Sequence, residues 1–194
     1  MTEPTAPHRV SPMKPLFPIL GILVAVFVAL LVIRNKLARV PMPTAGAPQA
    51  LEMGATLPDF TLNRFGGGST TLSKLASKIT FINFWATWCD ACMEEMPSIV
   101  SLRNAYKDKG FEVVAVNVDD NPASVLPRIT GKLKINFPVY VDPQGTLTDW
   151  FDVHAIPLSV IIDRNRKILL IENGGRNWDD NDMRSQLNEW LSAK

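Results

Sequence analysis

The sequence predicts an α/β domain that follows a single N-terminal membrane anchor. From about residue 51 onward, short runs rich in β-branched and aromatic residues alternate with helical patterns, which is typical of a sheet flanked by helices. Before this region, the 19 residues of the segment 15–33 carry no charge. A helix of that length spans about 28 Å, close to the thickness of the hydrocarbon core of a bilayer.

The first fifty residues divide into three segments. Residues 1–14 form an N-terminal tail, residues 15–33 the transmembrane anchor, and residues 34–50 a linker rich in Pro and Ala without apolar periodicity. The folded domain is expected at residues 51–194. A cleaved signal peptide is the main alternative to an anchor, but its apolar region is usually shorter. The best small-residue cleavage pattern, Ala45-Gly46-Ala47, is also followed by proline.

The net charge of +1 conceals an asymmetry along the chain. The first fifty residues hold five basic residues and one acid, whereas the remainder holds 15 basic and 18 acidic residues. A nucleic-acid-binding protein needs a basic patch on its folded part, so no nucleic-acid partner is expected.

The predicted elements follow in a regular order through the domain. A short strand at 59–62 leads to a hairpin turn at Gly66-Gly67-Gly68, which explains the glycine triplet better than a phosphate-binding loop does. The other expected strands are 79–85, 111–118, 137–141, 158–163 and 167–172, and the expected helices are 92–109, 123–133, 146–151 and 179–192. The last helix is amphipathic and directs Met183, Leu187, Trp190 and Leu191 toward the core.

The two cysteines lie where a buried strand runs into a helix. Cys89 and Cys92 form a Cys-x-x-Cys pair that opens this helix. Only a thiolate attacks a disulfide, and the N–H groups and dipole at a helix N-terminus stabilise a thiolate. Cys89 is therefore predicted to be an exposed nucleophile, and Cys92, one turn inward, to be the resolving cysteine.

Other uses of the pair are less consistent with the sequence. A zinc site lacks ligands, because His8 precedes the anchor and His154 is a single residue. Covalent haem attachment needs a histidine where the chain has Met93. A bridge across so short a loop removes little chain entropy, which disfavours a purely structural disulfide. We therefore expect no metal and no cofactor other than a redox-active Cys89–Cys92 disulfide.

The domain resembles the membrane-anchored TlpA/ResA-type branch of the thioredoxin superfamily, which includes the cytochrome c maturation thioredoxins. The resemblance covers about residues 54–192 and rests on short motifs along the chain. These are PDFTL at 58–62 with Leu72-Ser73, FWATWC at 84–89, VVAVNV at 113–118, NFPV at 136–139, and Ile156-Pro157 leading into VIID at 160–163. It implies a thioredoxin-like fold, with a central mixed sheet flanked by helices, an N-terminal β addition and a central insertion.

The resemblance also implies roles for particular residues. Pro157 matches the family's cis-proline, which would turn the backbone of Ile156 toward the active site to hold an extended substrate strand. Glu95 matches a buried glutamate, and it follows Cys92 by three residues, on nearly the same helix face. Such a carboxylate could exchange a proton with the inner thiol, although an ordinary surface glutamate is the alternative. The strand before the pair carries Asn83, which cannot relay a proton, so that task would fall to Glu95.

Three other residues close to the pair have expected roles. Asp90 places a negative charge that opposes a thiolate on Cys89, and this favours the disulfide and hence a reductant. Trp85 is expected in the core. Trp88, adjacent to Cys89, is expected to shield the pair or to contact substrate.

The favoured function is reduction of protein disulfides outside the cytoplasm, for example in cytochrome c maturation. Its partners would be proteins with cysteine thiols or disulfides and a membrane electron donor for the dithiol. Two alternatives remain: an oxidant or isomerase of protein disulfides, and a tethered copper-chaperone-like binding module that uses the cysteines with Met93 and Met96.

The expected location is the inner (cytoplasmic) membrane, with one span and the catalytic domain facing the periplasm or the outside. An anchored dithiol enzyme is most useful there. The charges beside the anchor point mildly the other way, because Arg9 and Lys14 precede it whereas Arg34, Lys36 and Arg39 follow it.

Overall fold

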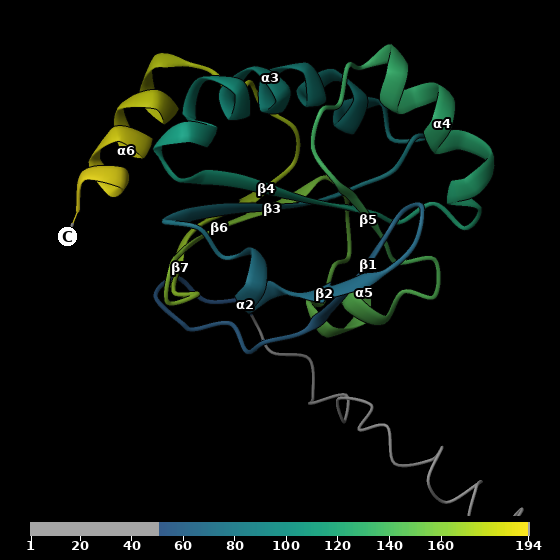
Figure 1. The fold of residues 1–194 in the computed structure, drawn as a ribbon, viewed down its shortest axis with the longest axis horizontal. Coiled ribbons are helices and arrows are strands. Elements are labelled where there is room, and N and C mark those ends of the chain that lie inside the picture. The colour runs from purple at the N-terminus through teal and green to yellow at the C-terminus, as the bar shows by residue number, and fades with distance from the viewer. Residues whose placement is uncertain (1–50, 194) are drawn as a thin grey trace, which may run out of the picture. The chain divides into compact units, whose positions relative to one another are not determined.

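A computed structural model describes residues 51–193 of the chain as a single mixed sheet with helices on both faces (Figure 1). The seven strands have the order β2-β1-β5-β4-β3-β6-β7. Helices α3, α4 and α6 cover one face, and α2 and α5 lie on the other (Figure 1). The predicted tail, anchor and linker at 1–14, 15–33 and 34–50 lie outside the described residues. Within the described part, none of the helices is both long and apolar enough to span a bilayer.

The elements have the following bounds. The strands are β1 (Thr61–Arg64), β2 (Ser69–Thr71), β3 (Ile79–Trp85), β4 (Phe111–Asn117), β5 (Val139–Val141), β6 (Leu158–Asp163) and β7 (Ile168–Asn173). The helices are α2 (Leu72–Leu75), α3 (Asp90–Tyr106), α4 (Pro122–Lys132), α5 (Thr146–Trp150) and α6 (Asn181–Ser192), with a short 3-10 helix η1 (Lys107–Lys109) after α3.

Strand β3 lies in the middle of the sheet and leads to the cysteine pair. It pairs in parallel with β4 and antiparallel with β6, and all seven of its residues are buried. Side chains alternate between the two faces of a strand. Phe81 and Trp85 accordingly join the core beneath α3, whereas Ile82 and Phe84 join the core on the other face. The same alternation places Asn83 on the α3 face.

Most predicted elements are confirmed within one or two residues. Helix α3 begins at Asp90 rather than at residue 92, because Cys89 caps it, and it ends at Tyr106 before η1. The predicted strand at 59–62 is displaced to Thr61–Arg64, since Asn63 and Arg64 pair with β5. Met183 and Leu187 are buried on α6, and Trp190 and Leu191 pack against the same core.

Two short elements, β2 and α2, were not predicted from the sequence. Strand β2 pairs antiparallel with β1, and the two form the N-terminal β addition that the resemblance implied. The glycine triplet makes the turn between them, and all three residues have positive φ, as a hairpin loop requires. Elements β5 and α5 lie between α4 and β6, in the middle of the domain.

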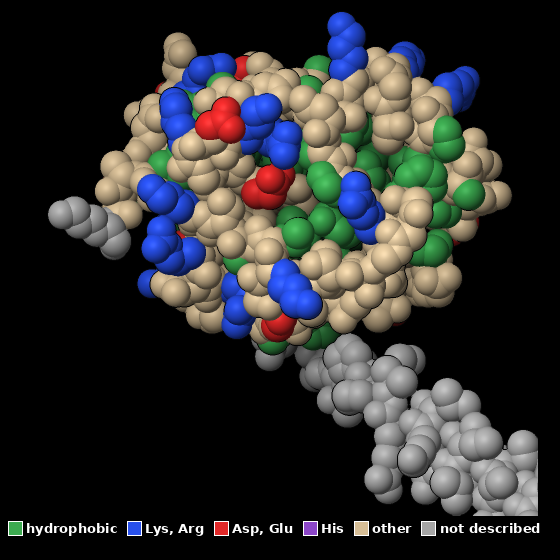
Figure 2. Space-filling model, viewed as in Figure 1, with side chains coloured by type: hydrophobic (Ala, Val, Ile, Leu, Met, Phe, Trp, Pro, Cys, Tyr) green, Lys and Arg blue, Asp and Glu red, His purple; other side chains and the backbone are tan. Residues whose placement is uncertain are grey.

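The surface in this orientation has scattered charge. Figure 2 shows Lys and Arg side chains distributed over the visible face, with hydrophobic side chains gathered from its centre to its right. One Arg–Glu pair, Arg103 with Glu112 at 3.1 Å, links α3 to β4. Arg103 also lies over the Phe137 ring, 5.9 Å from its centroid.

Candidate active site

Cys89 and Cys92 form a disulfide at the N-terminus of α3. Cys89 is the N-cap residue, and its sulfur accepts a hydrogen bond from the backbone N–H of Cys92 at 3.2 Å. The predicted exposure of Cys89 is wrong for this disulfide form, because the residue is only 8% exposed. Cys92 is completely buried, so Cys89 is still the more accessible of the two. The same N–H would stabilise a thiolate on Cys89 after reduction.

The segment between β3 and the pair is held by Asp119. Its Oδ2 accepts hydrogen bonds from the Thr87 backbone N–H at 3.0 Å and from Asn117 Nδ2 at 2.6 Å. Its Oδ1 accepts from the Thr87 hydroxyl at 2.9 Å. Asp119 is 5% exposed, so this carboxylate is buried but fully engaged. The sequence pattern did not indicate this role, because Asp119 lies 32 residues from Thr87.

The Ile156–Pro157 peptide bond is cis, as the resemblance implied. Pro157 is buried and begins the approach to β6, whereas Ile156 is partly exposed. The Ile156 carbonyl oxygen lies 3.7 Å from the Cys89 sulfur. The cis-proline loop and the cysteine pair therefore meet, although 67 residues separate them in the chain.

The two tryptophans before the pair differ in environment. Trp85 is completely buried, as expected for a core residue. Trp88 is 67% exposed, directly beside Cys89, so its ring can contact a substrate. Asp90 and Ala91, between the cysteines, are both exposed.

Glu95 is 3% exposed, which excludes the surface alternative. Its Oε1 accepts a hydrogen bond from Asn83 Nδ2 at 2.9 Å. Its Oε2 accepts from Trp178 Nε1 at 2.9 Å and from the Arg176 backbone N–H at 3.4 Å. Burial raises the pKa of Glu95 above its ordinary value, while the hydrogen bonds from Trp178, Asn83 and Arg176 oppose that rise.

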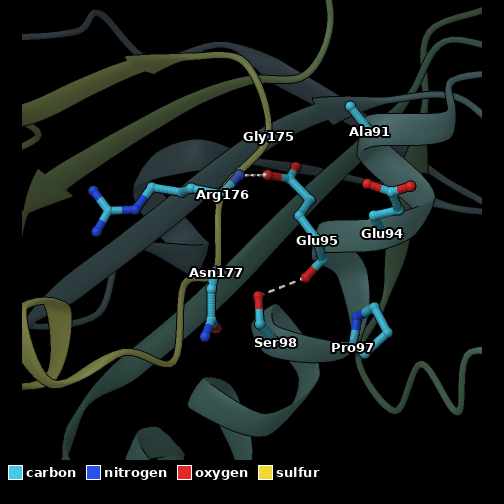
Figure 3. A pocket seen from close by; sticks show the side chains of 8 residues that line it. All are labelled: Ala91, Glu94, Glu95, Pro97, Ser98, Gly175, Arg176 and Asn177. Carbon is cyan, nitrogen blue, oxygen red and sulfur yellow. Dashed lines mark hydrogen bonds between the residues drawn. The ribbon is translucent and has the colours of Figure 1, made fainter.

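The loop between β7 and α6 closes the site from one side. The Gly174 N–H donates to the Pro157 carbonyl at 2.9 Å. Gly175 lies so close to Ala91 that a Cβ on it would approach the Ala91 carbonyl oxygen to 3.0 Å. A pocket of about 400 Å³ opens between this loop and α3, and Glu95 is one of the residues that line it (Figure 3). The sequence reasoning did not identify this loop.

No group of three or more His, Cys, Asp and Glu residues within 51–193 is placed to hold a metal ion. His154 is exposed and lies 3.2 Å from Asp152. Met96 is completely buried, and Met93 packs against the same core.

The fold and the site define a thioredoxin-like thiol–disulfide oxidoreductase. A cysteine pair at the start of a helix, beside a cis-proline that leads into an antiparallel strand, is the arrangement that the resemblance implied. Comparison with known proteins identifies the family. The Redoxin family profile matches residues 52–189.

The relatives are bacterial. The thiol-disulfide oxidoreductase ResA of Geobacillus kaustophilus is 34% identical over 131 residues, which cover 68% of this chain and 75% of the relative. ResA of Bacillus subtilis is 32% identical over 126 residues, covering 65% and 70%. A crystal structure from Chlorobium tepidum, assigned as the thiol:disulfide interchange protein DsbE, is 33% identical with a TM-score of 0.67, and the match covers 74% of this chain and 100% of that one. The chain belongs to the Redoxin family, within its TlpA/ResA-type branch of thiol–disulfide oxidoreductases.

Proposed function

We propose that this protein is a membrane-anchored reductant of protein disulfides that works outside the cytoplasm, for example in cytochrome c maturation. The observation that supports a reductant most directly is the acidic residue Asp90, which lies exposed between the two cysteines, with the buried Glu95 one turn beyond Cys92. Negative charge disfavours a thiolate on Cys89, and this stabilises the disulfide relative to the dithiolate form of the pair. A pair that prefers the disulfide gives its electrons away readily.

The reaction moves two electrons from the enzyme dithiol to the client. The Cys89 thiolate attacks one sulfur of the client disulfide, which forms a mixed disulfide and releases one client thiolate. The Cys92 thiolate then attacks the Cys89 sulfur and releases the second client thiolate. The client leaves with two thiols after taking up two protons, and the enzyme leaves with the Cys89–Cys92 disulfide. A membrane dithiol donor returns two electrons and two protons to the enzyme.

Glu95 supplies the base for the second step. The Cys92 thiol must lose its proton before it attacks, and Glu95 lies one turn further along α3 on nearly the same face. A carboxylate whose pKa is raised by burial holds that proton more readily than an exposed one does. Glu95 then passes the proton on to water.

The client binds as an extended strand beside Cys89. The Ile156 carbonyl, 3.7 Å from the Cys89 sulfur, is the acceptor for a backbone N–H of that strand. The exposed ring of Trp88, which precedes Cys89 in the chain, covers apolar side chains of that strand.

Membrane attachment of this enzyme rests on the uncharged segment 15–33. A single span in the inner membrane, with the domain facing the periplasm or the outside, raises the effective concentration of clients at that membrane. Protease treatment of intact spheroplasts should digest residues 51–194. A domain that remains protected in intact spheroplasts would place it in the cytoplasm.

The function is tested by trapping and by the potential of the pair. Full-length Cys92→Ser should accumulate a mixed disulfide between Cys89 and its client, whereas Cys89→Ser should not. The reverse pattern would exchange the roles of the two cysteines. Equilibration with thiol buffers should give a reduction potential more negative than about −200 mV, and a value near about −120 mV would identify an oxidant instead.

A further inference from the structure

Trp178 lies outside the family motifs, yet its side chain contacts Glu95, the proposed base. It lies 83 residues from Glu95 in the chain, yet its indole N–H donates to Glu95 Oε2 at 2.9 Å. The residue is completely buried, so this hydrogen bond forms out of contact with water. A hydrogen bond to an ionised group is stronger than one between neutral groups, and burial strengthens it further.

Trp178 is held in place both through its ring and through its backbone N–H. Its ring packs edge-on against Phe81 at a centroid distance of 4.6 Å. Its backbone N–H donates to the Ser98 hydroxyl at 2.9 Å, and that hydroxyl donates to the Glu95 carbonyl at 2.7 Å. Trp178 and Glu95 are therefore connected through their side chains and through Ser98.

Arg176 anchors the same loop from the outside. Its guanidinium lies 2.9 Å from the Asp180 carboxylate and 3.5 Å from that of Glu172. It also lies over the Trp178 ring, 5.1 Å from its centroid. With the side chain held in this way, the Arg176 backbone N–H points at Glu95 Oε2 (Figure 3).

The three hydrogen bonds divide unequally between the two carboxylate oxygens. Oε2 accepts two of them, from Trp178 and Arg176, whereas Oε1 accepts one, from Asn83. Protonation at Oε2 would weaken two contacts, so Oε1 is the oxygen left to take the proton. A pocket lined by Glu95, Gly175 and Asn177 lies beside this residue (Figure 3).

We propose that Trp178 is a positioning residue for the redox chemistry: its Nε1–H holds Glu95 Oε2 in place, favours the carboxylate, and leaves Oε1 to accept the proton. This inference rests on the proposed role of Glu95 as the base for Cys92. A phenyl ring at this position would keep the packing against Phe81 and lose the hydrogen bond to Glu95, although it would leave a small cavity.

The test replaces the indole N–H while keeping an aromatic ring. In the oxidised full-length protein, Glu95 is titrated by carbon-13 NMR of its carboxyl group. Trp178→Phe should raise the pKa of Glu95 by about one unit, the shift expected for one lost hydrogen bond to a carboxylate. The control is Trp150→Phe, because Trp150 is partly buried and packs against the core on the other face of the sheet, beside Phe60. An unchanged titration in Trp178→Phe would overturn the inference.

A second measurement separates positioning from general destabilisation. The pH profile of thiol alkylation in the reduced protein should shift upward in Trp178→Phe, but the same substitution in a Glu95→Gln background should shift nothing further. An equal shift in both backgrounds would show that the indole acts on the fold alone. If Glu95→Gln itself leaves the alkylation profile unmoved, the proposed role of Glu95 fails, while the NMR titration still decides the Trp178 contact.

A weaker variant covers the case in which Trp178→Phe does not fold. Ser98→Ala frees the Trp178 backbone N–H without altering the ring. It should raise the pKa of Glu95 in the same direction by a smaller amount, and a lowered or unchanged pKa would contradict the inference.

Discussion

Removal of the Asp119 carboxylate should destabilise the approach to the active site. Asp119 follows β4 and accepts hydrogen bonds from the Thr87 backbone, the Thr87 hydroxyl and the Asn117 amide. Asp119→Ala removes the acceptor of these three donors, and two of the donors belong to Thr87, two residues before Cys89. Unsatisfied donors in a buried site carry a desolvation cost that replacement of the whole network would avoid.

The size of the effect follows from the burial of the donors. A hydrogen bond to a charged group contributes about 1.5–3 kcal/mol. Thr87 is partly exposed, so water replaces some of the lost interaction, and we expect about 3 kcal/mol for the three bonds together. For a domain of this size, that loss lowers Tm by about 10 °C. Thr87→Val removes only the hydroxyl bond and should cost about 1 kcal/mol, whereas Thr87→Ser keeps it.

Urea unfolding of the oxidised protein measures these differences. The double variant Asp119→Ala/Thr87→Val should cost less than the sum of the single variants, with a coupling energy of about 1 kcal/mol, because both remove the same hydrogen bond. Additive losses, or an Asp119→Ala cost below about 1 kcal/mol, would refute the view that this carboxylate holds the segment before Cys89.

Two further predictions concern the loop after β7 and the buried carboxylate. Gly175→Ala should cost about 1–2 kcal/mol in urea unfolding, since the new Cβ would approach Ala91 to 3.0 Å, whereas Gly131→Ala on α4 meets nothing within 4 Å and should be neutral or stabilising. Equal effects at the two glycines would contradict the close contact. For Glu95, the raised pKa means that the folded state binds more protons than the unfolded state above the ordinary value of 4.5. The free energy of unfolding of the wild type, relative to that of Glu95→Gln, should therefore fall as the pH rises from 4.5 through the raised pKa of Glu95. A stability difference that grows with pH would refute this prediction.

The sequence alone was sufficient to place the cysteine chemistry and the strands beside it. Strand β3 is a largely apolar run, interrupted by Thr80 and Asn83, that ends at Trp85, and such a run indicates a buried strand without knowledge of its neighbours. The helix after β3 is also predicted from a local sequence pattern. The N–H groups of its first turn explain why Cys89 is expected to be the nucleophile. Elements β2 and α2 were not predicted, because segments of three and four residues are too short to show hydrophobic periodicity.

The residues that surround the two cysteines could be identified only from the tertiary structure. Spacing placed Glu95 on the face of Cys92, but its burial depends on Trp178 and Asn83, which come from distant parts of the chain. The hydrogen bond between Asp119 and Thr87 likewise depends on the tertiary structure, because the two residues follow neighbouring parallel strands. Hydrophobic periodicity reports which face of an element is buried, because burial repeats along it. A hydrogen bond between side chains 83 residues apart leaves no repeat, and it exists only once the sheet has brought the two ends together.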